Sequence, residues 1–167
     1  VKNRKSISRN SSWRDMANRV IRNDKDKLEE LFKMFDNIYS SHSGDMSRSY
    51  FADIIVSFTQ DIPYETIPNA MDIYAPVEFL KKYEGDCDTR TIFLYTLLKK
   101  YNYDVVILNS IVYKHSILGI NLPTSGSNYK YDNGRRYYAW ETTAKDMKRG
   151  LMSPSWSNMN NWFIALK

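Results

Sequence analysis

The chain has 167 residues, 43% of them hydrophobic with 13 Tyr, 7 Phe and 4 Trp, which is enough to fill the core of one domain. No apolar run approaches the roughly 18 residues of a membrane-spanning helix, and the single cysteine, Cys87, excludes an internal disulfide framework and leaves the compartment open. The net charge of +5 comes from residues 1–22, which carry seven basic groups and one acidic group, whereas residues 23–167 carry 17 basic and 18 acidic groups. Since no recognition motif accompanies this charge, no nucleic-acid partner is expected.

Residues 1–22 are interpreted as a basic, polar leader or linker, and residues 23–167 as one domain. A basic polar segment is most often solvated, and an arm that binds a polyanion is the alternative. Trp13, Val20 and Ile21 indicate that the leader begins to pack on the domain by its end.

Two amphipathic helices are predicted next. Residues 24–41 have Asp24 in position to cap them and apolar side chains three and four residues apart. These apolar residues are Leu28, Leu31, Phe32, Phe35 and Ile38. The second helix extends from about Ser47 to Phe58 and ends before Pro63, because the residue before a proline avoids the helical region. His42 lies in the loop between them, at 40–45, and is expected to be a surface residue rather than a ligand.

The stretch around Cys87 predicts a helix with a reactive first turn. Residues 61–76 contain three prolines and no clear period, so they read as an irregular connection, followed by a helical turn at 77–80. Asp86 is then a good N-cap, and apolar residues at 93, 94, 97, 98 and 101 have helical spacing. In the first turn, free N–H groups and the helix dipole make a thiol easier to ionise. Cys87 is therefore a candidate nucleophile, and the alternative is a small, buried core residue.

The second half of the chain is rich in β-branched residues and predicts strands at 104–109, 111–120, 136–142 and 162–166. Residues 121–134 form a loop in which Asn133 and Gly134 mark a turn. Helices followed by strands indicate an α+β domain with an antiparallel sheet.

Two residues of this half could serve a thiol nucleophile. His115 stands in the second predicted strand and can take the thiol proton and return it to a leaving group. Glu141 on the next strand can orient the imidazole across the ladder. Taken singly, His115 is more often a core or surface residue and Glu141 an exposed acid. The order of helix with Cys, strand with His and strand with acid favours a catalytic set.

These residues resemble the transglutaminase-like superfamily of papain-fold cysteine enzymes, in its bacterial and archaeal branch. The resemblance covers about residues 47–152 and is carried in order by FTQDIPY (58–64), PVEFL (76–80), GDCD (85–88), HSILGI (115–120) and YAWETT (138–143), closing with Gly150. It implies a papain-like fold whose nucleophile helix packs on the antiparallel sheet, and a triad carried onto Cys87, His115 and Glu141. The chain departs from the pattern at the third member, where many relatives have the shorter Asp.

The resemblance also draws attention to Gln60. Papain-like enzymes often hold the developing oxyanion with a side-chain amide beside the backbone N–H of the cysteine. Gln60 is a candidate for this role, and simple capping of a helix end is the alternative. Asp86, Cys87, Asp88 and His115 include zinc-ligand types, but one cysteine and two histidines do not supply the usual set for a structural zinc. No metal and no cofactor is therefore expected.

The sequence thus predicts a cysteine-dependent acyl-transfer enzyme that attacks peptide or carboxamide bonds through a thioester. Hydrolysis is the favoured outcome, because small bacterial members of the superfamily resemble peptidases more often than cross-linking enzymes. A cross-linking transglutaminase is one alternative, and a non-catalytic binding or scaffold domain with the aromatic loop 129–138 as contact surface is another. The expected partner is a protein or peptide. The resemblance further suggests a domain of a larger exported or membrane-attached bacterial protein, hence an extracytoplasmic location.

Overall fold

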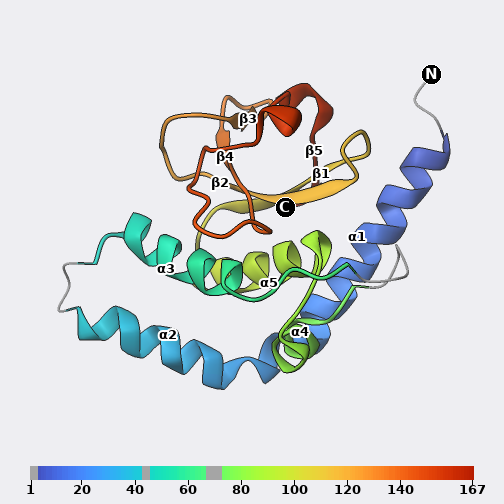
Figure 1. Cartoon of the computed structure of the whole chain (residues 1–167). Helices are drawn as coiled ribbons and strands as arrows, with labels where there is room; N and C mark the ends of the chain where they lie inside the picture. The colour runs from blue at the N-terminus through green and yellow to red at the C-terminus, as the bar shows by residue number, and fades with distance from the viewer. Residues whose placement is uncertain (1–3, 43–45, 67–72) are drawn as a thin grey trace.

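The helices and the sheet form two layers (Figure 1). The computed structural model describes residues 4–42, 46–66 and 73–167, with side chains from residue 11 onward; residues 43–45 of the predicted loop and 67–72 of the predicted connection lie outside this range. The helices are α1 (Arg4–Asp24), α2 (Glu29–Ser41), α3 (Arg48–Gln60), α4 (Pro76–Lys82) and α5 (Cys87–Lys100), with 3₁₀ turns η1 (Lys25–Lys27), η2 (Pro154–Trp156) and η3 (Met159–Asn161). The strands are β1 (Val105–Ser110), β2 (His115–Ile120), β3 (Asn128–Lys130), β4 (Arg136–Trp140) and β5 (Phe163–Leu166). The predicted α+β class is confirmed.

The sheet has the strand order β3-β4-β2-β1-β5, and every pair of neighbours is antiparallel. Pairing of β1 with β2 runs from Val105 opposite Ile120 to Ser110 opposite His115, so His115 stands at the end of the ladder. Alternate side chains face opposite sides of a strand. One face accordingly packs on the helices, and the other is covered by residues of the chain between β4 and β5.

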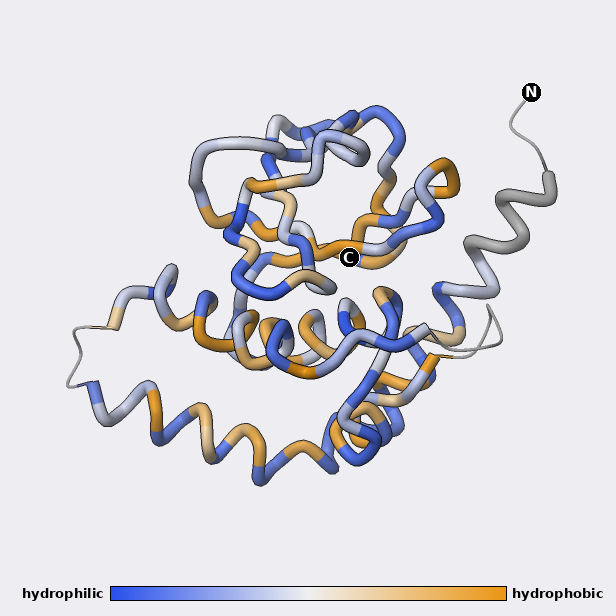
Figure 2. The backbone as a smooth tube through the Cα atoms, viewed as in Figure 1, coloured by the Kyte–Doolittle hydropathy of each residue, from blue (hydrophilic) through white to orange (hydrophobic). Residues whose placement is uncertain are grey.

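Helix α5 lies at the centre of the domain. The carboxylate of Asp86 accepts a hydrogen bond of 2.9 Å from the backbone N–H of Thr89, which confirms the predicted N-cap. All residues from 89 to 98 are buried, between the sheet on one side and α3 and α4 on the other. Figure 2 shows apolar stretches on α5 and on the strands that lie over it. This burial on all sides fixes the first turn, and with it Cys87, against the sheet.

The predicted elements are found with four corrections. The strand predicted at 136–142 ends at Trp140, so Glu141 lies just after β4 rather than on a strand. Helix α2 begins at Glu29 rather than at 24, and Asp24 does not cap it: its carboxylate accepts a 2.9 Å hydrogen bond from the N–H of Val77 in the first turn of α4. The strand predicted from residue 111 begins at His115, because residues 111–114 form turns. The predicted loop 121–134 contains the short edge strand β3.

Residues 4–22 of the predicted leader belong to α1, which contacts α4, α5 and β5. Ala17 is buried, and Trp13, Val20 and Ile21 pack on the core at their partly buried faces, as their types indicated. Arg14 donates a 2.7 Å hydrogen bond from Nε to the carbonyl of Ala165. No helix of the described residues is long and apolar enough to cross a membrane.

Candidate active site

Cys87 is the first residue of α5 and is partly buried. The backbone N–H of Ser116, the neighbour of His115 in β2, favours the ionised form of its thiol. Burial raises the pKa of the Cys87 thiol to about 12, the negative charges of Asp88, Asp86 and Glu141 act in the same direction, and the Ser116 N–H opposes them. The expectation of an easily ionised thiol is therefore wrong for the resting structure, because desolvation and nearby carboxylates outweigh the helix N-terminus.

His115 and Glu141 are in direct contact. Nε2 of His115 lies 2.9 Å from Oε2 of Glu141, and both side chains are nearly covered, at 8% and 3% exposure. They come together because β2 and β4 are neighbours: Leu118 pairs with Trp140, so the start of β2 lies beside the end of β4. Within the described residues, the other ring nitrogen of His115 has no hydrogen-bond partner. That nitrogen is free to act as a base.

Glu141 is held firmly on its second oxygen as well. Its Oε1 accepts hydrogen bonds from the N–H groups of Thr142 at 2.8 Å and Thr143 at 2.9 Å, and from the Thr143 hydroxyl at 2.7 Å. Burial alone would raise the pKa of Glu141, but the hydrogen bond and charge of His115 and the bonds from Thr143 together lower it. The acid is thus a fixed carboxylate at neutral pH, suited to orient an imidazole.

Two tryptophans cover the histidine, and sequence reasoning missed them as site residues. The His115 ring lies 4.5 Å from that of Trp156 and 6.1 Å from that of Trp162, between ring centroids. The indole N–H of Trp162 donates to the carbonyl of Trp156 at 3.0 Å and so ties the two together. Trp156 lies in η2, in a stretch without sequence pattern, and Trp162 falls only in the strand predicted at 162–166, which gives no sign of a contact with His115. Their rings shield the His115–Glu141 hydrogen bond from water, which strengthens it.

Gln60 has a different role from the one expected. Its side-chain Nε2 donates to the carbonyl of Glu141 at 2.8 Å and to that of Met147 at 2.9 Å. Both N–H groups of the amide are therefore engaged, and neither is left for an oxyanion. The correction has a simple cause: the amide is buried, and two carbonyls of the turn after β4 face it. Gln60 instead holds the turn that carries Glu141.

Asp88 follows Cys87 and is partly buried on the sheet side of α5. The hydroxyl of Ser116 is hydrogen-bonded to the Asp88 carboxyl group and, at 2.9 Å, to Oδ1 of Asn109. Burial raises the pKa of Asp88, while the hydrogen bond from the Ser116 hydroxyl acts in the opposite direction. Among the described residues, no group of three or more His, Cys, Asp and Glu side chains is arranged to hold a metal ion.

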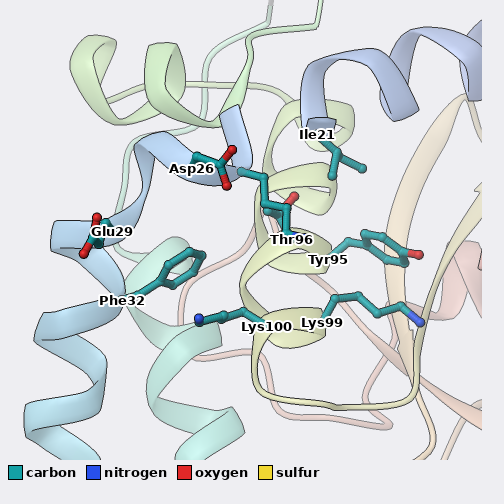
Figure 3. A pocket seen from close by; sticks show the side chains of 9 residues that line it. Ile21, Asp26, Glu29, Phe32, Tyr95, Thr96, Lys99 and Lys100 are labelled. Carbon is teal, nitrogen blue, oxygen red and sulfur yellow. The ribbon is translucent and has the colours of Figure 1, made fainter. Parts of the chain in front are cut away.

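A separate cavity of about 680 Å³ lies toward the other end of α5 (Figure 3). Its walls come from the end of α1, η1, the start of α2 and the last turns of α5, including Ile21, Phe32, Tyr95 and Lys99. With a rise of 1.5 Å per residue, Tyr95 is already about 12 Å along the helix from Cys87. The cavity therefore takes no part in the arrangement around the thiol.

Comparison with models of protein families gives no match, and comparison with curated proteins gives none either. Among solved structures, the chain is similar in fold to Legionella pneumophila LapG in its calcium-bound and EGTA-treated forms, at 17% identity in both cases. The TM-score is 0.43 for the calcium-bound form, with 81% of each chain covered. For the EGTA-treated form it is 0.47, with 89% of this chain and 78% of that one covered. At these values the likeness is one of distant fold, and the chemistry rests on the geometry of the site.

Proposed function

We propose that this chain is a cysteine-dependent hydrolase of peptide or carboxamide bonds, with Cys87 as nucleophile, His115 as base and Glu141 as the group that orients the base. The observation that carries the proposal is the 2.9 Å contact between the covered side chains of His115 and Glu141. His115 begins β2, which packs on α5, and Cys87 is the first residue of α5. A carboxylate that accepts a hydrogen bond from one ring nitrogen selects, in the neutral imidazole, the tautomer in which the other nitrogen is an acceptor, as a general base requires.

Because the thiol is neutral at rest, its proton moves to His115 as the sulfur attacks. The new S–C bond gives a tetrahedral oxyanion, and when the C–N bond breaks His115 returns the proton to the departing amine. Water then attacks the thioester with His115 as base, releases the acid and restores the thiol. The backbone N–H of Cys87 has no partner among the described residues, and its place in the first turn of α5 suits it to bind the oxyanion.

The experiment is a screen of internally quenched peptides with the parent, Cys87→Ala and His115→Asn, followed by mass spectrometry of the products. We expect the parent alone to release a free carboxylic acid. A fluorescent primary amine in the same assay separates hydrolysis from transamidation, since a cross-linking enzyme would incorporate it. If the folded parent neither cleaves the library nor forms an adduct with peptide vinyl sulfones at Cys87, the proposal is wrong.

A non-catalytic binding domain is the second candidate, and the raised pKa of Cys87 is the observation that favours it. Its suggested contact surface is less free than the sequence indicated, because Tyr137 is fully buried and Tyr129 and Tyr131 pack on the outer face of the sheet. Dependence of Cys87 alkylation on His115 separates the two candidates. An inert structural thiol would react at the same rate in His115→Asn as in the parent.

A further inference from the structure

Arg90 is a fully buried cation one turn after Cys87, with 0% of its surface exposed. Its guanidinium donates to four backbone carbonyls. Nε donates to Gly85 at 3.1 Å and Nη1 to Thr59 at 2.9 Å and Thr142 at 3.1 Å, while Nη2 donates to Ile62. A buried charge is costly unless its donors are satisfied. All three guanidinium nitrogens of Arg90 donate hydrogen bonds, so the side chain is held in one position.

The four carbonyls belong to the segments that carry the proposed active groups. Gly85 lies in the loop just before Cys87, and Thr142 directly follows Glu141. Thr59 and Ile62 flank the end of α3, where Gln60 holds the neighbouring carbonyl of Glu141. One side chain therefore links the nucleophile loop, the acid turn and the helix end. Since a guanidinium is planar with its N–H directions fixed, it sets where each carbonyl lies relative to the others.

None of the direct partners of Arg90 is a carboxylate, so its positive charge is balanced only by carboxylates that lie beyond hydrogen-bonding distance. Burial lowers the pKa of Arg90, while the nearby Tyr64 and the negative charges of Glu141 and Asp86 act in the opposite direction. The positive charge thus lies within reach of two of the acidic groups that hold the Cys87 thiol in its neutral form. A lysine could carry the charge, but its single nitrogen could not hold carbonyls spread along the guanidinium.

We propose that Arg90 is a positioning residue: it sets the distance between the Cys87 loop and the Glu141 turn, and it offsets the carboxylates around the thiol. The inference rests on the function proposed above. Misplacing a reacting group by about 1 Å can cost on the order of a hundredfold in rate. We call Arg90 with its four carbonyl partners the clamp. Loss of the clamp should therefore lower the reactivity of Cys87 in a domain that is still folded.

The test compares Arg90→Ala, Arg90→Lys and Arg90→Gln with the parent by the rate of Cys87 alkylation with iodoacetamide from pH 5 to 10, well below each melting temperature. Arg48→Ala is the control for loss of an arginine. Arg48 is exposed and donates to the carbonyls of Tyr101 and Asn102 at the far end of α5, so this variant removes guanidinium–carbonyl hydrogen bonds away from the site. We expect Arg90→Ala to react about tenfold or more slowly at pH 7. Millimolar guanidinium chloride should restore part of the rate, urea should not, and Arg48→Ala should match the parent.

Hydrogen exchange keeps this proposal separate from the catalytic one. The Thr142 and Thr143 amides bind Glu141, and they should exchange faster in Arg90→Ala whether or not the chain is an enzyme. If His115→Asn leaves alkylation unchanged while Arg90→Ala still loosens these amides, the proposed function fails and the clamp stands. If a folded Arg90→Ala variant shows the same rate of Cys87 alkylation and the same exchange of these two amides as the parent, Arg90 is not a positioning residue. Should Arg90→Ala not fold, the same two readings on Arg90→Lys decide in the same way.

Discussion

At the scale of single residues, the resting state of Cys87 gives the first prediction. With its pKa raised to about 12, the thiol is neutral at pH 7, so the rate of its direct alkylation should climb tenfold per pH unit through the neutral and alkaline range. Iodoacetamide kinetics from pH 5 to 10 measure this slope. A flat region of high reactivity between pH 5 and 8 would instead reveal a thiolate–imidazolium pair, and the neutral-thiol mechanism would be wrong.

Glu141 gives the second prediction, on activity. Glu141→Gln keeps the size and the hydrogen bonds from Thr142 and Thr143 but cannot stabilise the His115 cation. We expect peptide cleavage to fall by on the order of 10²-fold or more, with the melting temperature at pH 7 changed far less. Thr143→Val, which removes only one donor, is the milder control. Full activity of Glu141→Gln would assign the orienting role to another group.

The pH dependence of stability provides the third prediction. The pKa of Glu141 is lowered in the folded state, so the unfolded chain binds its proton first as the pH falls. The stabilisation is complete above the ordinary value of 4.5 and is lost as the pH drops through the folded value. Urea unfolding between pH 7 and 3 should therefore show a smaller acid loss of stability in Glu141→Gln than in the parent. Equal acid sensitivity of the two would contradict the assignment.

At the scale of elements, the N-cap of α5 affects both the stability of the helix and the pKa of the Cys87 thiol. Asp86 stabilises the helix through Thr89 and raises the pKa of Cys87 through its charge. Asp86→Ala should cost about 0.5–2 kcal/mol by loss of the cap. Asp86→Asn keeps a capping oxygen and removes the charge, so its stability should stay near that of the parent while Cys87 alkylates faster at a given pH. Thermal melts and alkylation rates on the two variants separate the contributions.

The elements that could be predicted from sequence are those whose evidence is local. Periodic apolar residues and the Asp86 cap predicted α5, and β-branched runs predicted β1 and β2. Edge strand β3 was not predicted, because its three residues show no alternation of polar and apolar side chains. The hydrogen bond of Asp24 could not be predicted for another reason: its donor is the N–H of Val77, which lies 53 residues later in the chain.

At the scale of the whole molecule, the site could be predicted only in its outline. Order along the chain suggested Cys87, His115 and Glu141 together, but the thiol pKa depends on burial and on carboxylates that only the fold brings close. The same holds for Gln60 and Arg90, whose polar groups act on carbonyls of segments distant in sequence. Residue type shows which chemistry is available, whereas partners and desolvation follow from packing.

Helix α1 gives the last prediction, because it spans both a basic end and a packed end. Trp13 packs on the core, and Arg14 donates a hydrogen bond to the carbonyl of Ala165 in β5. The charge of the first residues is remote in sequence from every group of the proposed site. Deleting residues 1–10 should therefore leave the melting temperature and Cys87 alkylation nearly unchanged.

Trp13→Ala should behave differently from that deletion. Burying a large apolar side chain fully contributes about 1.5–3 kcal/mol, and Trp13 is partly covered, so a loss of about 1–2 kcal/mol is expected. At roughly 2–4 °C per kcal/mol for a chain of this size, thermal melts resolve it. Trp13→Phe keeps most of the packing and should therefore show a smaller loss of stability than Trp13→Ala. Loss of Cys87 reactivity on deletion of residues 1–10 alone would instead make the basic end of α1 part of the active site.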